Sequence, residues 1–118
     1  MPRFVVLRHD SPRGLHWDLM LETGAVLATW ALAEEPRPGR TCPAEELANH
    51  RLAYLDYEGP ISAGRGHVTR WDEGLYTTHE QGPTQLALAM SGARLQGRVT
   101  LTRSAEESAA WQFCWEGE

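Results

Sequence analysis

Residues 15–32 read LHWDLMLETGAVLATWAL, and the pattern of this stretch decides the class of fold. In its first half, LHWDLMLE, a leucine or tryptophan fills every second position, and the side chains between them are mostly polar. Successive side chains of a β-strand point to opposite faces, so this period of two predicts a strand with one apolar face. The TGA that follows predicts a hairpin turn into a second strand, VLATWAL.

Short apolar segments and turn residues continue to alternate along the chain, with a turn signal about every ten residues. We expect further strands at 3–9, 50–58, 67–72, 75–79, 85–92, 95–103 and 111–116. A short helix is expected at 42–49, because Pro43 suits the first helical position and Glu45 and Glu46 suit the first turn. The sequence therefore predicts an all-β fold, a small closed antiparallel β-barrel of about eight strands, with the 118 residues in a single domain.

The composition is that of a globular domain with an excess of acidic residues. Hydrophobic residues make up 42% of the chain, and the formal net charge is −5. This charge disfavours a strong non-specific binder of nucleic acid, although the basic residues, all of them arginine, could gather at one site beside a bound cation. Cys42 and Cys114 form no disulfide framework, and the apolar run FVVL is too short to span a bilayer. We therefore expect a cytoplasmic protein with no membrane association.

His9, His16 and Asp18 are the candidate metal ligands. His16 and Asp18 lie two positions apart in the expected strand, so both side chains leave the same face about 7 Å apart. The turn at 10–14 places His9 across from His16 on the neighbouring strand. Two imidazoles and a carboxylate form a set that binds Mn²⁺, Zn²⁺ or Fe²⁺ with positions left open for water or substrate. The alternative is a polar strand face exposed to solvent, and spacing alone does not exclude it.

His50 and Tyr54 form a second candidate pair. In an extended strand at 50–58 they share a face and lie about 13 Å apart, so both could face a phosphate-sized site. Asp56 and Glu58 lie on the same face, and each is a candidate for acid–base or phosphate-binding chemistry. A polar strand end with an ordinary tyrosine at the rim of the core explains the same pattern.

The remaining features favour structural roles. GPISAGRG at 59–66 lacks the GK[ST] of a phosphate-binding loop and is expected to be a flexible connector. His67 and His79 stand alone, and Trp17, which alternates with the candidate ligands, is expected to face the core. The other tryptophans are expected to pack in the barrel rather than stack on bases: Trp30, Trp71, Trp111 and Trp115.

Three blocks of the sequence resemble a known family. They are HD…LHWDLMLE at 9–22, NHRLAYLDYEGPI at 49–61 and GHVTRWDEGLY at 66–76, and similarity continues through SGARLQGRVTLTR to WQF. In this order the blocks are similar to the 3′-phosphoesterase domain of bacterial DNA ligase D, over nearly the whole chain. The sequence carries no ligase or polymerase module, so the resemblance implies a stand-alone or separated, divergent member.

The resemblance implies a fold, a reaction and a set of site residues. The family is a compact β-barrel flanked by short helices that heals broken DNA ends, removing a 3′-terminal ribonucleoside and then a 3′-phosphate with Mn²⁺. Its metal ligands match His9, His16 and Asp18. Its catalytic, phosphate-contacting histidine matches His50, and its essential tyrosine matches Tyr54. The implied cofactor is one divalent metal, Mn²⁺ first and Zn²⁺ or Co²⁺ as alternatives.

Several family positions hold different residues in this chain. The arginine two residues after the metal-binding aspartate is Met20 here, and a lysine beyond the following strand falls at Glu34. A glutamine before the first histidine is Leu7, and a glutamate before the catalytic histidine is Ala48. The arginine and the lysine bind phosphate in the family, so their loss bears directly on catalysis.

This loss leaves more than one hypothesis open. The first is a metal-dependent 3′-phosphoesterase and 3′-ribonuclease-like enzyme of non-homologous end joining. It would act on DNA or RNA 3′ ends, with DNA ligase or polymerase repair proteins as candidate partners. Arg13 and Arg40 are then the tentative phosphate ligands, with Arg37 and Arg65 as other substitutes. The second is a catalytically weakened, metal-dependent module that binds a nucleic-acid end or a repair protein. A structural barrel without metal is a third.

Overall fold

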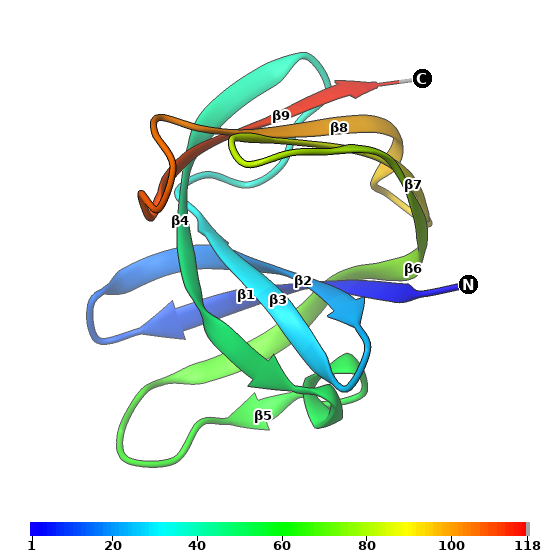
Figure 1. Cartoon of the computed structure of the whole chain (residues 1–118). Helices are drawn as coiled ribbons and strands as arrows, with labels where there is room; N and C mark the ends of the chain where they lie inside the picture. Colours follow the sequence, from blue (N-terminus) through cyan, green and yellow to red (C-terminus); the bar gives the residue numbers. More distant parts are fainter. Residues whose placement is uncertain (118) are drawn as a thin grey trace.

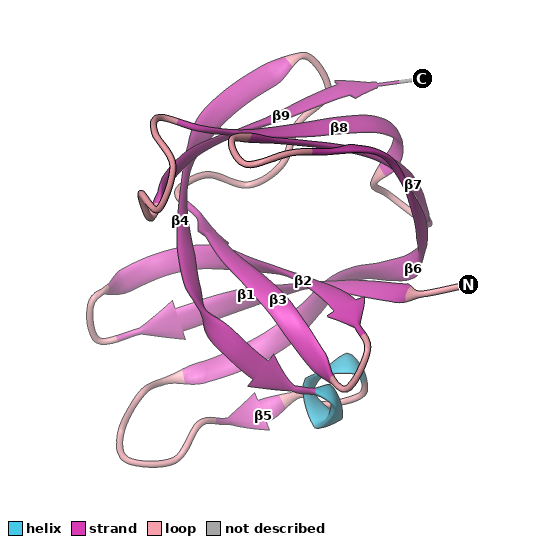
Figure 2. Cartoon of the chain, in the orientation of Figure 1, coloured by secondary structure: helices cyan, strands magenta, loops and turns pink. Residues whose placement is uncertain are grey.

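The computed structural model describes residues 1–117, and its regular structure is almost entirely β-strand (Figure 2). The elements are β1 (Arg3–Ser11), β2 (Gly14–Thr23), β3 (Val26–Leu32), β4 (Arg40–Arg51), the 3₁₀ helix η1 (Leu52–Leu55), β5 (Gly59–Pro60), β6 (His67–Gln81), β7 (Gln85–Gly92), β8 (Gln96–Arg103) and β9 (Ala110–Gly117). One sheet holds the strands in the order β1-β2-β3-β4-β9-β8-β7-β6-β5, and β1 also pairs with β6 (Figure 1). Eight strands therefore close into an antiparallel ring, which confirms the predicted all-β, barrel-like fold.

Apolar side chains cover both faces of the first two strands. Phe4 and Val6 on β1 belong to a large buried cluster to which β1–β4 and β6–β9 all contribute, so this cluster fills the interior of the ring. Val5 and Leu7 alternate with them and belong to a second cluster, completed by Met20, Leu27, Leu55 and Val68. Because successive side chains of a strand point to opposite faces, the second cluster lies on the outer face of the sheet. The apolar run FVVL is thus buried on both sides.

The tryptophans behave as the sequence predicts. Trp17, Trp30, Trp111 and Trp115 are all buried in the interior cluster. Trp30 and Trp111 meet edge to face with ring centroids 5.6 Å apart. Trp71 is partly buried against the same cluster, and the guanidinium of Arg94 covers its ring at 3.9 Å.

The helix predicted at 42–49 is wrong, because these residues belong to strand β4. This stretch lies between β3 and β9 and pairs with both. Cys42 and Ala44 alternate inward and are buried in the interior cluster, and the carbonyl of Pro43 accepts a hydrogen bond of 3.0 Å from the Ala33 N–H. Pairing with two neighbouring strands and burial of one face in the core favour a strand here more than Pro43, Glu45 and Glu46 favour a helix. The preference of a residue for a strand depends largely on such packing.

The strand expected at 50–58 is also wrong. After β4 the chain turns into η1, and only Gly59 and Pro60 pair again as β5 (Figure 1). Leu55 on η1 is 4% exposed and completes the outer cluster, so burying one leucine favours a turn of helix over an extended chain. The two strands expected at 67–72 and 75–79 are a single strand, since β6 runs unbroken along β1 and then β7, with a register shift opposite Val6 and Leu7.

Asp72 fixes the connection between β7 and β8. Its carboxylate is 5% exposed and accepts hydrogen bonds from three backbone N–H groups, those of Ala93 (3.1 Å), Arg94 (3.0 Å) and Leu95 (2.7 Å). A Cβ on Gly92 would overlap this carboxylate, so the turn requires glycine there. The aspartate in the sequence block GHVTRWDEGLY at 66–76 therefore has a structural role, which is to hold the β7–β8 connection.

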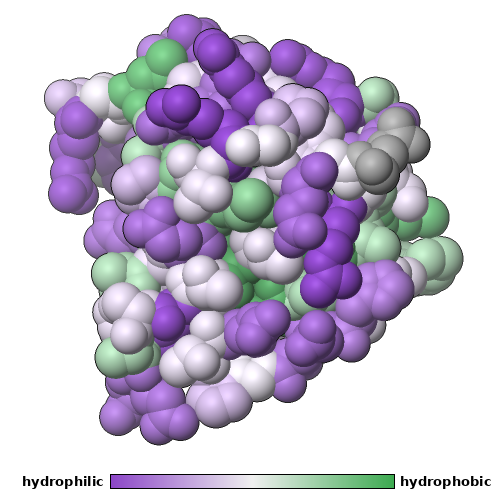
Figure 3. All heavy atoms as spheres, turned by 90° about the horizontal axis from the view of Figure 1, so that it is seen from above, coloured by the Kyte–Doolittle hydropathy of each residue, from purple (hydrophilic) through white to green (hydrophobic). Residues whose placement is uncertain are grey.

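The face of the molecule seen from above is mainly hydrophilic. In the view from above, hydrophobic residues form small separate areas among polar ones (Figure 3). Within residues 1–117, no helix has the length and apolar character needed to cross a membrane.

Candidate metal centre

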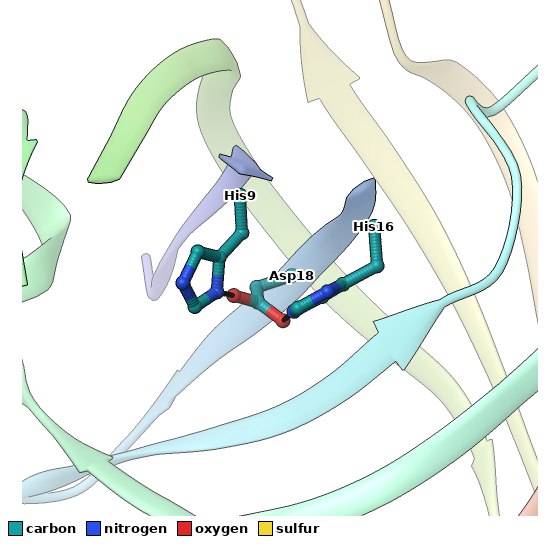
Figure 4. Close-up of side chains that lie close together, drawn as sticks. All are labelled: His9, His16 and Asp18. Atoms are coloured by element: carbon teal, nitrogen blue, oxygen red, sulfur yellow. Dashed lines mark hydrogen bonds and ion pairs between the residues drawn. The ribbon is translucent and has the colours of Figure 1, made fainter. Parts of the chain in front are cut away.

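The β1–β2 hairpin brings His9, His16 and Asp18 together on the outer face. His9 pairs with His16 across the two strands, as predicted, and Leu7 pairs with Asp18. The imidazole centroids of His9 and His16 lie 4.6 Å apart. One potential ligand atom from each of the three residues lies within 4.8 Å of the other two. Figure 4 shows the Asp18 carboxylate between the two imidazoles.

Asp18 is nearly inaccessible to solvent and contacts both histidines. Its Oδ2 lies 3.1 Å from His9 Nδ1, and its Oδ1 lies 3.1 Å from His16 Nε2 (Figure 4). The second contact is close but does not have hydrogen-bond geometry, so Oδ1 is buried without a donor. Buried polar atoms in folded proteins nearly always have a partner, so this oxygen needs a cation or another donor.

A carbonyl oxygen determines which nitrogen of His9 faces Asp18. His9 Nε2 lies 2.8 Å from the backbone oxygen of Arg65. A carbonyl only accepts hydrogen bonds, so Nε2 carries the proton and donates. In neutral His9 the lone pair is therefore on Nδ1, which faces the Asp18 carboxylate. Two electron-rich atoms then face each other, and a shared proton or metal cation relieves the repulsion.

These contacts shift the pKa of both partners. The hydrogen bond with Asp18 raises the pKa of His9 above its ordinary value of 6.5, against burial, which lowers it. Burial is the largest influence on Asp18 and acts to raise its pKa. The contacts with His16 and His9 together outweigh burial and hold the pKa of that carboxyl below its ordinary value. Asp18 is therefore an anion at neutral pH.

The three residues fit a divalent metal ion. Atoms bound to one ion at about 2.1 Å lie at most about 4.2 Å apart, so the observed cluster needs only small side-chain rotations. The set offers neutral nitrogen and anionic oxygen, which suits Mn²⁺, Zn²⁺ or Co²⁺. The Arg65 carbonyl supplies the outer hydrogen bond that metal-bound histidines usually make. The role of the three residues as metal ligands remains a prediction.

An open cavity of about 980 Å³ lies over the three residues. Arg13 from the β1–β2 turn, Arg65 from the loop before β6 and His50 from β4 also line it. Cavities of this size accept small organic ligands, and a phosphate alone would leave most of the volume empty.

The structure brings His50 and Tyr54 closer together than the sequence predicts. Their ring centroids lie 5.6 Å apart, edge to face, in place of the expected 13 Å, because η1 shortens the chain between them. His50 Nδ1 lies 2.9 Å from the Ala48 carbonyl, so Nδ1 carries a proton and Nε2 is the nitrogen available to a ligand. Tyr54 is not among the lining residues and packs between His50 and Tyr57.

The other predicted site residues are scattered. Arg40 does not line the cavity and forms an ion pair of 2.9 Å with Glu34, which lowers the pKa of that carboxyl. Asp56 pairs with Arg3 at 2.9 Å. Glu58 accepts a hydrogen bond of 2.7 Å from the backbone N–H of Arg70. These groups have partners on the surface and do not join the cavity.

The loop at 61–66 has a role that the sequence does not predict. The guanidinium of Arg65 folds back onto Ser62, with bonds of 2.8 Å to its carbonyl and 3.0 Å to its hydroxyl, and Ile61 N–H donates to the Gly66 carbonyl at 2.7 Å. Gly66 has φ of +88°, and a Cβ there would overlap the Asp10 carbonyl. The expected flexible connector is thus a braced loop that directs the Arg65 carbonyl at His9. The glycines of this loop are the sequence feature that could have indicated a defined turn in place of a flexible connector.

Comparison with known proteins identifies the family. The sequence profile of the DNA Ligase D 3′-phosphoesterase domain matches residues 7–103. The chain belongs to this family.

Its relatives are larger proteins. The chain is 34% identical over 113 residues to the multifunctional non-homologous end joining protein LigD of Pseudomonas aeruginosa, an alignment that covers 86% of this chain and 13% of the relative. It is 33% identical over 111 residues to the protein of the same name from Mycobacterium bovis, covering 86% of this chain and 14% of the relative. The chain therefore spans about one seventh of the length of these relatives.

The structure also places the residues at which the resemblance implies other side chains. Met20 and Leu7 are buried together in the outer apolar cluster. Glu34 forms an ion pair with Arg40. Arg13 and Arg65 are the arginines that line the cavity within the described chain.

Proposed function

We propose that this chain is a metal-dependent phosphoesterase that removes a 3′-phosphate or 3′-ribonucleotide from nucleic-acid ends in non-homologous end joining. The observation that carries the proposal is the convergence of His9, His16 and the unpartnered Asp18 Oδ1 at a cavity shared with His50. Family membership supports the type of reaction.

Each residue of the site has a distinct part in the proposed reaction. His9 Nδ1, His16 and Asp18 hold the divalent metal, and a metal bound there would polarise a phosphoryl oxygen and activate water. His50, with Nδ1 held by the Ala48 carbonyl, presents Nε2 to a phosphate oxygen or to the leaving oxygen, where it gives or takes a proton. Arg13 supplies positive charge at the cavity rim, and Arg65, whose guanidinium is hydrogen-bonded to Ser62, adds to the positive charge there.

Tyr54 acts in this proposal as a positioning residue. It packs edge to face on His50 and does not line the cavity, so we expect its ring to matter more than its hydroxyl. Tyr54→Phe should retain activity and the pH–rate profile of the wild type, whereas Tyr54→Ala should lower kcat and alter that profile by freeing His50. Strong loss of activity in the phenylalanine variant would instead place the hydroxyl on the substrate.

The test is release of phosphate from 3′-phosphorylated single strands and primer–templates with Mn²⁺, Zn²⁺ or Co²⁺. Asp18→Asn should abolish release, and His50→Ala should lower kcat by about 100-fold or more, the usual contribution of acid–base catalysis. His79→Ala, an exposed histidine outside the cavity, is the matched control and should behave as wild type. No release with any metal, once metal binding is verified, would overturn the enzymatic proposal.

One observation favours a second function. The positions of the family cations hold Met20, buried in the outer cluster, and Glu34, paired with Arg40. A site weakened in this way could bind a 3′-phosphorylated end without turning it over. Tight, metal-dependent binding of such an end with no phosphate release would support this binding function over the enzymatic one.

A further inference from the structure

The two ends of the cavity differ in chemistry. Its arginines, Arg13 and Arg65, come from the β1–β2 turn and the loop before β6, next to the metal ligands. The lining contributed by β3, β4 and β9 contains neither arginine nor lysine. It consists mainly of small or apolar side chains, with Glu45, Gln112 and, at the end of β4 that holds the proposed catalytic site, His50 as polar exceptions.

The strand register places this second end beside the metal ligands in a straight row. Asp18 pairs with Ala31, Ala31 with Glu45, and Glu45 with Ala110. All four side chains alternate with buried interior residues, so they share the outer face. Adjacent strands lie about 4.8 Å apart, so Ala110 is about 14 Å across the sheet from Asp18.

Small side chains make this part of the outer face hollow. Ala31 and Ala110 lie on either side of Glu45, and Pro43, Leu47 and Gln112 surround them. The lack of cations there excludes a good site for a second phosphate or for a phosphodiester backbone. A shallow apolar hollow with a carboxylate and an amide beside it suits a planar ring with hydrogen-bonding edges.

We infer that this arm of the cavity, formed by β3, β4 and β9, binds the nucleobase of the terminal nucleoside whose 3′-phosphate lies at the metal ligands. The inference rests on the proposed function and names its substrate more closely. Arg13 and Arg65 take the phosphate end, and the apolar arm takes the base. Glu45 accepts hydrogen bonds from the edge of the base, and Gln112 both accepts and donates.

This arrangement requires an unpaired terminal nucleotide. A base that is stacked and paired in a duplex cannot reach a floor on the protein surface, so it must first leave the stack. The substrate class is therefore a single-stranded or frayed 3′ end. Binding of the base should be tolerant of sequence, because every base offers an apolar face.

The test compares ligands that differ only in the terminal base. The Mn²⁺-loaded full chain is titrated with a 3′-phosphorylated single strand, with the same strand carrying an abasic terminal nucleoside, and with inorganic phosphate. We expect the strand with the base to bind at least about 10-fold more tightly than the abasic strand, the usual effect of stacking one base. Equal affinities of the two strands would overturn the inference, and this comparison needs no variant.

The second half of the test uses a substitution that fills the apolar arm of the cavity with a larger side chain. Ala110→Leu should remove the preference for the base and leave the affinities for Mn²⁺ and inorganic phosphate unchanged. Ala105→Leu, an exposed position outside the cavity, is the matched control and should retain the preference. An Ala110→Leu protein that still prefers the base would overturn the placement in this arm.

The same titrations distinguish failure of the proposed function from failure of the base-binding inference. Inorganic phosphate and the abasic strand report on the metal end alone. If neither of them nor the base-bearing strand binds to the Mn²⁺-loaded protein, the proposed function is overturned, and this inference with it.

Discussion

At the scale of single residues, the centre depends on hydrogen bonds that aim the ligands. His9 is directed by a carbonyl 56 residues away in the sequence, that of Arg65, and Asp18 is aimed by its place on β2. The sequence predicts that His9, His16 and Asp18 come together, because a period of two and a short turn fix their face and register. It does not predict the carbonyl, because any residue provides one and only the folded loop determines its direction.

Gly66→Ala tests the importance of this carbonyl. The added Cβ would overlap the Asp10 carbonyl, so the loop must move and carry the Arg65 oxygen away from His9. Loss of an outer hydrogen bond to a metal ligand typically weakens metal binding about 10- to 100-fold. Calorimetric titration with Mn²⁺ measures the change. Gly82→Ala, where a Cβ meets no atom within 4 Å, is the control, and Gly66→Ala binding as tightly as this control would contradict the argument.

The raised pKa of His9 predicts how metal binding depends on pH. A proton and a metal ion compete for His9 Nδ1, and the metal-free protein holds that proton more tightly than an ordinary histidine does. Mn²⁺ affinity should therefore be full at high pH and fall as the pH is lowered, starting above the ordinary pKa of 6.5. Titrations across this range locate the midpoint. A midpoint below 6.5 would show that Asp18 does not stabilise the protonated imidazole.

At the scale of elements, long-range pairing overrides local signals. β7 agrees with its predicted range because alternation, turns and core face all favour a strand. At β4 the proline and glutamates favour a helix, but β3 and β9 provide partners that a local pattern cannot reveal. At 52–55 the burial of Leu55 replaces an expected strand by η1, and that change decides the distance between His50 and Tyr54.

Asp72→Ala tests the turn between β7 and β8. The substitution leaves three backbone N–H groups without their acceptor, at least one of them in a buried position, and should lower the free energy of unfolding by about 2–4 kcal/mol. Urea unfolding measures this. Asp56→Ala removes only an exposed ion pair with Arg3 and should change the midpoint little. Equal midpoints for the two variants would contradict the anchoring role of Asp72.

At the scale of the whole molecule, the sheet carries two apolar surfaces and the candidate site lies beside the outer one. The interior cluster closes the ring, and the outer cluster holds η1 against β1, β2, β3 and β6. The sequence predicts the ring, because alternating segments and turns recur throughout. It does not predict that Leu55 of η1 joins Met20 in one outer cluster, since the two residues lie far apart in the chain.

Met20→Arg tests whether the outer apolar cluster contributes to the stability of the fold. Restoring the arginine of the family pattern would place a charge among Leu7, Leu27 and Leu55, and we expect a loss of stability of at least about 2 kcal/mol. Denaturant unfolding of the variant measures it, with Arg37→Ala, an exposed change, as the control. Unchanged stability together with faster phosphate release would show instead that the site accepts a cation at this position.

The central claim is that His9, His16 and Asp18 bind one divalent cation. Anomalous diffraction from crystals soaked in Mn²⁺ tests it directly, with crystals of Asp18→Asn as the comparison. We expect one anomalous peak among the three side chains, within bonding distance of His9 Nδ1, and no peak in the variant. Well-ordered crystals with no peak there, or a peak that persists in the variant, would contradict it.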